Sequence, residues 1–201
     1  IYLDHLVCGY DQFQVPELHF TVNFGQRLQV AGPNGSGKTT LIQTLLGNIP
    51  AKSGKVVLGH GVHFGYISQD TLAGNFEGTI LDYVKQNDPE VAESFIFTLF
   101  DKLNLAYELR NKKYNLLSPG ERTRVNLIRL ILEKANVLVL DEVTNHLDRE
   151  ALELIYELLK SYEGTIISIS HNRAYNDLLK PDMTLDICTG LLHQEHMVRR
   201  R

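Results

Sequence analysis

A glycine-rich stretch most constrains what this chain can fold into. Residues 32–39, GPNGSGKT, fit the phosphate-loop pattern G-x-x-x-x-G-K-[ST] in full. Before this stretch, Arg27–Ala31 is predicted to form a strand, and after it residues 40–46 carry apolar side chains at helical spacing. This order of strand, glycine-rich loop and helix predicts an α/β fold with a P-loop core.

The chemistry of this loop suits a nucleoside di- or triphosphate and Mg²⁺. Glycines let successive backbone N–H groups point into one concavity, and the following helix aims its positive end at the same place. Lys38 is expected to reach the β- and γ-phosphates, and the Thr39 hydroxyl to bind Mg²⁺. The residues expected to contact the nucleotide are Gly32, Pro33, Asn34, Gly35, Ser36, Gly37, Lys38, Thr39 and Thr40. The alternative interpretation is a simple glycine-rich turn, but the flanking strand and helix favour a phosphate loop.

Composition narrows the class of protein. The chain has 201 residues, of which 43% are hydrophobic and 22% charged, so we expect one globular domain over residues 1–201. No apolar run approaches the roughly 20 residues of a membrane span, and the first residues lack the features of a signal peptide. The absence of an initiator Met suggests a fragment, and cytoplasm is the expected location. We expect Cys8 and Cys188 to be buried, reduced thiols, because both lie in apolar, strand-like surroundings.

Hydrophobic patterning divides the chain into layers. Residues 1–31 are predicted to form an N-terminal antiparallel β layer, and residues 55–59 and 62–67 to form two further short strands. From residue 79 to about 110 the pattern is helical, within a small helical subdomain that we expect to cover about residues 72–135. Val137–Asp141 is continuously apolar before its final acid, as expected for a central strand that is buried on both faces.

Two carboxylates follow that central strand. Asp141 is placed to hold Mg²⁺, and Glu142 to act as a general base on an attacking water. An acidic pair after a strand can also simply begin a turn or helix. The phosphate loop upstream favours the catalytic interpretation.

A second loop leads into a helix at Ser118, Pro119, Gly120 and Glu121. Ser118 is suited to cap the helix, Pro119 to take its first position, and Glu121 to complete a capping box. The same geometry also presents a hydroxyl and free N–H groups to an anion. The residue pattern alone leaves both interpretations open.

Taken in order, GPNGSGKTT, YISQD, LSPGE, VLVLDE and SISHNR resemble the motifs of the ATP-binding cassette (ABC) domain, over nearly the whole chain. The resemblance implies ATP hydrolysis in a head-to-tail pair, in which the signature loop, Ser118 to Glu121, serves the partner's nucleotide. It further implies that Tyr10 stacks on adenine, Gln69 contacts Mg²⁺ and water, and His171 contacts the γ-phosphate. Asn145 and Asp148 would lie at the interface between the two cassettes.

Three positions depart from the family pattern. In the signature loop, which usually reads LSGGQ, Pro119 stands for a glycine and Glu121 for the glutamine, so that one backbone donor is lost and a charge is gained. After Glu142, Val143 stands for the usual proline.

The segment TNHLD, residues 144–148, resembles the ABC-F subfamily, whose members carry two cassettes in one chain and act on the ribosome. The SPGERTR stretch is similar to the second cassette of such proteins. This resemblance predicts a second ABC domain, in the same parent chain or in a homodimer, and the ribosome as partners, with a role in translation or antibiotic resistance. The alternatives are the ATPase subunit of a membrane transporter, with a membrane domain as its partner, and a nucleotide-binding module without turnover.

Overall fold

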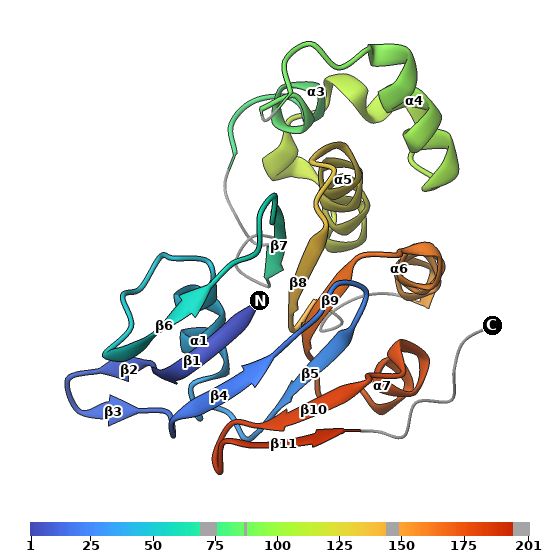
Figure 1. The fold of residues 1–201 in the computed structure, drawn as a ribbon. Helices are drawn as coiled ribbons and strands as arrows, with labels where there is room; N and C mark the ends of the chain where they lie inside the picture. The colour runs from blue at the N-terminus through green and yellow to red at the C-terminus, as the bar shows by residue number, and fades with distance from the viewer. Residues whose placement is uncertain (69–75, 87, 144–148, 195–201) are drawn as a thin grey trace.

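A six-stranded sheet forms the centre of the molecule (Figure 1). The computed structural model describes residues 1–68, 76–86, 88–143 and 149–194. The sheet has the order β11-β10-β5-β9-β8-β7, with β11 antiparallel to β10 and the other neighbours parallel. Its strands are β5 (Arg27–Ala31), β7 (Phe64–Ser68), β8 (Val137–Asp141), β9 (Thr165–Ile169), β10 (Met183–Asp186) and β11 (Leu191–Gln194). This is the α/β, P-loop core that the sequence predicts.

Both faces of this sheet are buried, which explains the continuous apolar run of β8. Val139 packs in one core with apolar residues of α1 (Lys38–Leu45), whereas Leu138 and Leu140 pack in the other core with α5 (Pro119–Leu132). Helices α6 (Arg149–Ser161) and α7 (Arg173–Leu179) cover the second face (Figure 1). All five residues of β8 and of β9 are buried as a result.

A three-stranded antiparallel sheet forms the N-terminal β layer. Its order is β4-β1-β6, from β4 (Leu18–Thr21), β1 (Tyr2–Val7) and β6 (Ser53–Val57). The expectation that residues 1–31 form one layer is wrong in one respect, because β5 belongs to the central sheet and β6 completes the layer instead. A separate pair, β2 (Gly9–Tyr10) and β3 (Phe13–Gln14), forms a short hairpin.

The helical subdomain stands apart from α1 at the far end of the central sheet (Figure 1). Its elements are α3 (Ile80–Val84), α4 (Glu93–Lys102), the 3₁₀ helices η1 (Tyr107–Asn111) and η2 (Tyr114–Leu116), and α5. The helical pattern expected from 79 to 110 is therefore interrupted, and Val91 lies outside any helix. Pro89 accounts for part of this break, since the residue before a proline disfavours helical geometry.

Buried polar contacts fix α5 against α3. The Tyr83 hydroxyl donates to Oδ1 of Asn126 over 2.8 Å, and Nδ2 of Asn126 donates to the Tyr114 hydroxyl over 2.8 Å. The two tyrosine rings stack with centroids 4.2 Å apart. Burial raises the pKa of the Tyr114 hydroxyl, which favours its neutral, hydrogen-bonding form.

The two cysteines differ, although both were expected to be buried. Cys8 is fully buried, whereas Cys188 is exposed because β10 ends at Asp186 and the chain turns there. Both are free thiols. Among the residues that the structure describes, none of the helices has the length and apolar character needed to cross a membrane.

Candidate nucleotide-binding site

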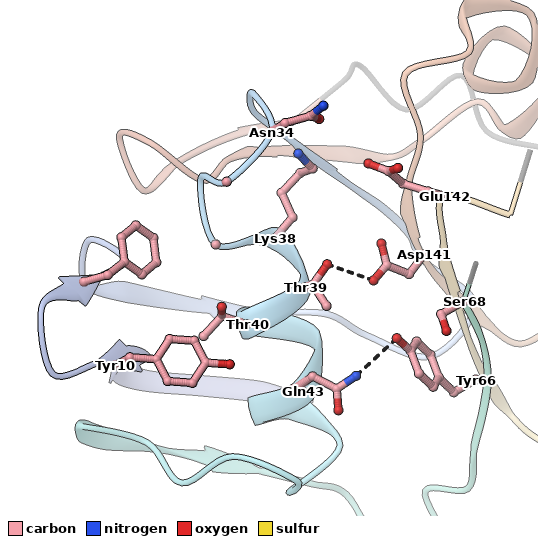
Figure 2. Close-up of a pocket in the computed structure, with 13 residues that line it drawn as sticks. Tyr10, Asn34, Lys38, Thr39, Thr40, Gln43, Tyr66, Ser68, Asp141 and Glu142 are labelled. Atoms are coloured by element: carbon pink, nitrogen blue, oxygen red, sulfur yellow. Dashed lines mark hydrogen bonds between the residues drawn. The ribbon is translucent and has the colours of Figure 1, made fainter. Parts of the chain in front are cut away.

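One cavity of about 750 Å³ lies at the carboxyl ends of the central strands and along the start of α1 (Figure 2). Its volume falls in the range of small-molecule and cofactor sites. Ten of its thirteen lining residues are polar, charged or glycine, and the other three are aromatic. Tyr66 lies beside Ser68 on β7, whereas Tyr10 lies across the cavity on the β2–β3 hairpin (Figure 2). The lining residues are Tyr10, Phe13, Asn34, Gly35, Gly37, Lys38, Thr39, Thr40, Gln43, Tyr66, Ser68, Asp141 and Glu142.

The phosphate loop connects β5 to α1 with backbone geometry that requires glycine. Gly37, the N-cap of α1, has φ 96° and ψ 12°, in the left-handed region. A Cβ at this position would lie 2.7 Å from Cγ2 of Val15 and 2.9 Å from ring atoms of Phe13. The loop therefore depends on glycine both for its turn and for the close approach of the β2–β3 hairpin.

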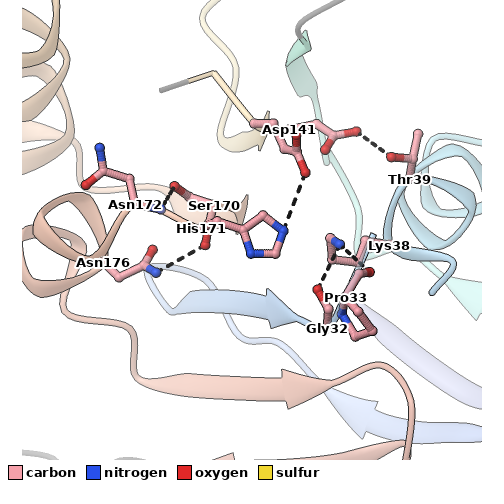
Figure 3. A network of polar contacts seen from close by, with 10 residues as sticks. Gly32, Pro33, Lys38, Thr39, Asp141, Ser170, His171, Asn172 and Asn176 are labelled. Atoms are coloured by element: carbon pink, nitrogen blue, oxygen red, sulfur yellow. Dashed lines mark hydrogen bonds and ion pairs between the residues drawn. The ribbon is translucent and has the colours of Figure 1, made fainter. Parts of the chain in front are cut away.

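Lys38 is buried at the first turn of α1, with 6% of its surface exposed. Its ammonium donates to the carbonyl oxygen of Gly32 over 2.9 Å and to that of Pro33 over 2.8 Å (Figure 3). The Ser36 hydroxyl in the same loop is buried and has no hydrogen-bond partner among the described residues. A loop with a buried ammonium and a hydroxyl that still lacks a partner fits a polyphosphate, whose oxygens accept from both.

Thr39 and Asp141 meet at the end of the cavity that borders the central sheet. The Thr39 hydroxyl donates to Oδ2 of Asp141 over 3.0 Å (Figure 2). Burial raises the pKa of the Asp141 carboxyl, and the negative charge of Glu142 adds to this rise, while the Thr39 hydrogen bond and the Lys38 charge oppose it. A hydroxyl and a desolvated carboxylate form an oxygen donor set that fits Mg²⁺.

Glu142 follows β8 in a strained backbone conformation. Its φ is 53°, in the left-handed region that non-glycine residues seldom occupy, and its N–H donates to the carbonyl of Ile169 over 2.9 Å. Its carboxylate lines the cavity (Figure 2), and Oε1 lies 3.7 Å from Nε2 of His171. His171 comes from the end of β9, where Ser170 accepts a hydrogen bond from the N–H of Asn172. The structure thus brings four predicted residues, Lys38, Asp141, Glu142 and His171, into one region.

Two aromatic side chains that line the cavity come from the β2–β3 hairpin. Tyr10 is 56% exposed and is paired across the hairpin with Phe13, which is 37% exposed. The sequence analysis named Tyr10 and missed Phe13. A signal for Phe13 was present in the short stretch Tyr10–Phe13, whose spacing suits a tight hairpin that presents both rings, but the stretch is too short to show a strand period.

The signature loop lies outside this cavity, in the helical subdomain. Ser118 accepts a hydrogen bond at its hydroxyl from the N–H of Glu121, and its own N–H donates to Oε2 of Glu121 over 2.7 Å. This is the predicted capping box, with Pro119 in the first turn of α5. Partial burial would by itself raise the pKa of Glu121, but its hydrogen bonds to Ser118 and the nearby Lys112 lower it overall. Ser118 and Pro119 are exposed, and Gly120 is partly exposed.

Three predicted residues cannot be placed. Gln69, Asn145 and Asp148 lie outside the described residues. Their expected contacts with Mg²⁺ and with a partner cassette remain predictions.

Comparison with known proteins identifies the family. The family model described as "ABC transporter" matches residues 15–145, well over half of the chain. The chain belongs to the ABC transporter family. It is an ABC ATPase nucleotide-binding domain, and the family as a whole is associated with ATP hydrolysis.

Relatives of this ABC domain are longer proteins. The chain is 36% identical over 184 residues to the uncharacterized ABC transporter ATP-binding protein YfmM of Bacillus subtilis, covering 92% of this chain and 34% of YfmM. It is 34% identical to the ribosome protection protein VmlR of Bacillus subtilis, covering 78% of this chain and 28% of VmlR. It is 31% identical to the ABC transporter F family member 2 of Arabidopsis thaliana, covering 85% of this chain and 26% of that protein. The chain thus spans about a quarter to a third of the length of these relatives.

Solved structures show the same fold. A bacterial Atm1-family ABC exporter with ATP bound superimposes with a TM-score of 0.81 at 22% sequence identity, covering 96% of this chain and 38% of the exporter. At this level of identity the likeness concerns the ABC fold alone.

Proposed function

We propose that this ABC domain binds ATP with Mg²⁺ and hydrolyses it as one of two head-to-tail cassettes of an ABC-F protein that acts on the ribosome. The observation that carries the ATP proposal is the arrangement of Lys38, Thr39, Asp141 and Glu142 around one cavity. Relatives named as a ribosome protection protein and as an F family member support the ribosomal role.

In this proposal the aromatic residues of the β2–β3 hairpin bind the base, and the phosphate loop binds the phosphates. Tyr10 contacts the adenine base, because its ring lies across the cavity from Asp141 and Glu142 (Figure 2), and Phe13, its partner across the hairpin, lines the same cavity. The loop N–H groups and Lys38 hold the phosphates, while Thr39 and Asp141 would hold Mg²⁺, which would neutralise charge on the phosphate oxygens. Gln69 would complete the metal and water contacts.

Glu142 acts as the general base. Its carboxylate takes a proton from the water that attacks the γ-phosphorus, while the bond to the β-phosphate oxygen breaks and ADP and phosphate are formed. His171, 3.7 Å from the Glu142 carboxylate, contacts the γ-phosphate in this arrangement. Its side chain is 52% exposed, which leaves room for it to turn towards a phosphate oxygen.

The second cassette completes the site. Ser118 and Gly120 lie outside the chain's own cavity, and the exposed capping box presents its hydroxyl to another molecule. We therefore expect the isolated domain to be a weak ATPase whose rate per chain rises with protein concentration. A rate near 10 s⁻¹ that does not depend on concentration would contradict the shared site.

The experiment uses the parent protein with Glu142→Gln, which preserves shape and hydrogen bonding but removes the base. ATP should then be held unhydrolysed, and the protein should co-sediment with ribosomes in ATP but not without nucleotide. Adding Lys38→Ala to the same protein should release it from the ribosomes. Binding to ribosomes that ignores ATP would contradict the coupling, and ATP-dependent recovery with the membrane fraction would favour a transporter subunit instead.

A further inference from the structure

A second cluster of metal-ligating side chains lies on the outer face of the small antiparallel sheet, away from the nucleotide cavity. Asp4, His5 and His19 each offer one ligand atom, and these atoms all lie within 4.8 Å of one another. The cluster comes from two neighbouring strands, β1 and β4, and nothing in the proposed ATPase function uses it.

A β-bulge brings Asp4 and His5 to the same face. Between the pairs Leu3↔Phe20 and Leu6↔Leu18, two residues of β1 face the single residue His19 of β4. In a regular strand, Asp4 and His5 would point to opposite faces. Here Leu3 and Leu6 are both buried, and the two residues between them are both directed outward, with φ of 50° at His5.

The third strand of the sheet is adapted to this bulge. Gly54 of β6 lies beside it, and a Cβ there would fall 2.1 Å from the carbonyl oxygen of His5. Gly54 itself has φ 68°, so glycine meets both the steric and the backbone requirement. The bulge is therefore accommodated by both neighbouring strands.

Neighbouring side chains orient the cluster. Nδ1 of His5 contacts Oε1 of Glu17 at 2.5 Å, which leaves Nε2 of the same ring available. The His5 and His19 rings lie with centroids 4.2 Å apart, and Nδ1 of His19 is 3.9 Å from Oδ1 of Asp4. The Tyr2 hydroxyl donates to Oδ1 of Asp4 over 3.1 Å.

We propose that Asp4, His5 and His19 form a binding site for a divalent transition metal ion of the zinc class, with Glu17 as the carboxylate that positions His5. Two imidazoles and a carboxylate are ligands that Zn²⁺ accepts, with solvent at the remaining position. A carboxylate hydrogen-bonded to the second nitrogen of a ligating histidine fixes the ring and raises its basicity. Small rotations of the exposed histidine side chains bring the ligand atoms to bonding distance, since 50% of His19 and 62% of His5 is exposed.

One nearby cation opposes metal binding. Nζ of Lys55 lies 3.6 Å from Oδ2 of Asp4 and is the competing positive charge on this carboxylate. Protons compete as well, because the hydrogen bond to Glu17 raises the pKa of His5 and the metal needs the neutral imidazole.

The test is calorimetric titration of Zn²⁺ into the untagged 201-residue chain, with Mg²⁺ present in excess. We expect saturable binding of one ion, weakened at least about tenfold in His5→Asn and in His19→Asn, and about 10–100-fold in Glu17→Gln. Asparagine tolerates the left-handed backbone at position 5, so this variant keeps the bulge. Lys55→Met should tighten binding by about 2–5-fold, the effect of removing an exposed ion pair.

His60→Asn is the matched control, since His60 is an exposed histidine of the turn after β6. It should bind Zn²⁺ as the parent chain does. Circular dichroism verifies that each variant is folded, and the ring signals of His5 and His19 in nuclear magnetic resonance spectra should shift with Zn²⁺ while those of His60 do not. Binding that is absent, that survives both histidine changes or that falls equally in His60→Asn overturns the proposal.

Discussion

Gly37→Ala tests whether the phosphate loop depends on glycine for space as well as for backbone conformation. An alanine at φ 96° adds about 1–2 kcal/mol of backbone strain to the folded state. Its Cβ would also lie 2.7 Å from Cγ2 of Val15, which is only 1% exposed, and 2.9 Å from the Phe13 ring. Displacing a packed side chain costs about 1–3 kcal/mol more. The free energy of unfolding should therefore fall by about 2–5 kcal/mol.

Gly35→Ala is the matched control within the same loop. Gly35 has φ 77°, but a Cβ there meets nothing within 4 Å, so only the backbone strain of about 1–2 kcal/mol applies. Urea unfolding followed by circular dichroism gives both values without nucleotide. In a chain of this length, 1 kcal/mol shifts the melting temperature by about 2–4 °C, so Gly37→Ala should melt at least about 2 °C below Gly35→Ala. Equal or greater destabilisation by Gly35→Ala would refute the steric argument.

Three further predictions concern single side chains. Asp141→Asn should stabilise the nucleotide-free chain at pH 7, because burial raises the pKa of the Asp141 carboxyl in the folded state. The free energy of unfolding of the parent chain therefore falls as the pH rises above the pKa of this carboxyl in the unfolded state. The stability gained by Asp141→Asn, measured by urea unfolding, should vanish below about pH 4. Labelling with a thiol reagent in native buffer should modify Cys188 and spare Cys8, because Cys8 is buried and this burial raises its pKa to about 11. Rapid labelling of both cysteines would contradict the burial of Cys8. Ser118→Ala should lower the free energy of unfolding by about 0.5–2 kcal/mol, because the N–H of Glu121 loses its acceptor, whereas Ser118→Asp should keep most of it; equal losses would argue against the cap.

The parts of the fold that the sequence predicts are those with a strong local signature. The phosphate loop needs glycine and lysine at fixed spacing, and β8 must be apolar throughout because helices cover both of its faces. The capping box at Ser118 and Glu121 is likewise local, and the structure has it as predicted. Each of these features depends on contacts within a few residues or on the burial of a whole strand.

The sequence-based predictions are wrong where contacts between distant parts of the chain determine the burial of a side chain or the path of the backbone. Cys188 sits in an apolar stretch, but the chain leaves the sheet after Asp186, and the thiol is exposed. Apolar residues alternate with polar ones from Leu18 to Phe24, which predicts that Phe24 is buried, but Phe24 is 75% exposed because pairing with β1 ends at Thr21. The bulge at His5 leaves no mark in the sequence pattern, since it depends on Gly54 in a strand about fifty residues away.

The central claim, that this ABC domain binds ATP through its phosphate loop, is tested most directly by calorimetry of ATP with Mg²⁺ on the parent chain and on Lys38→Ala. Loss of a buried, charge-assisted hydrogen-bond donor should weaken binding by about 1.5–3 kcal/mol, or roughly 10–150-fold. Lys102→Ala, which removes an exposed ammonium at the end of α4, should bind as the parent does. Equal affinity for ATP in the parent chain and in a folded Lys38→Ala variant would contradict the account.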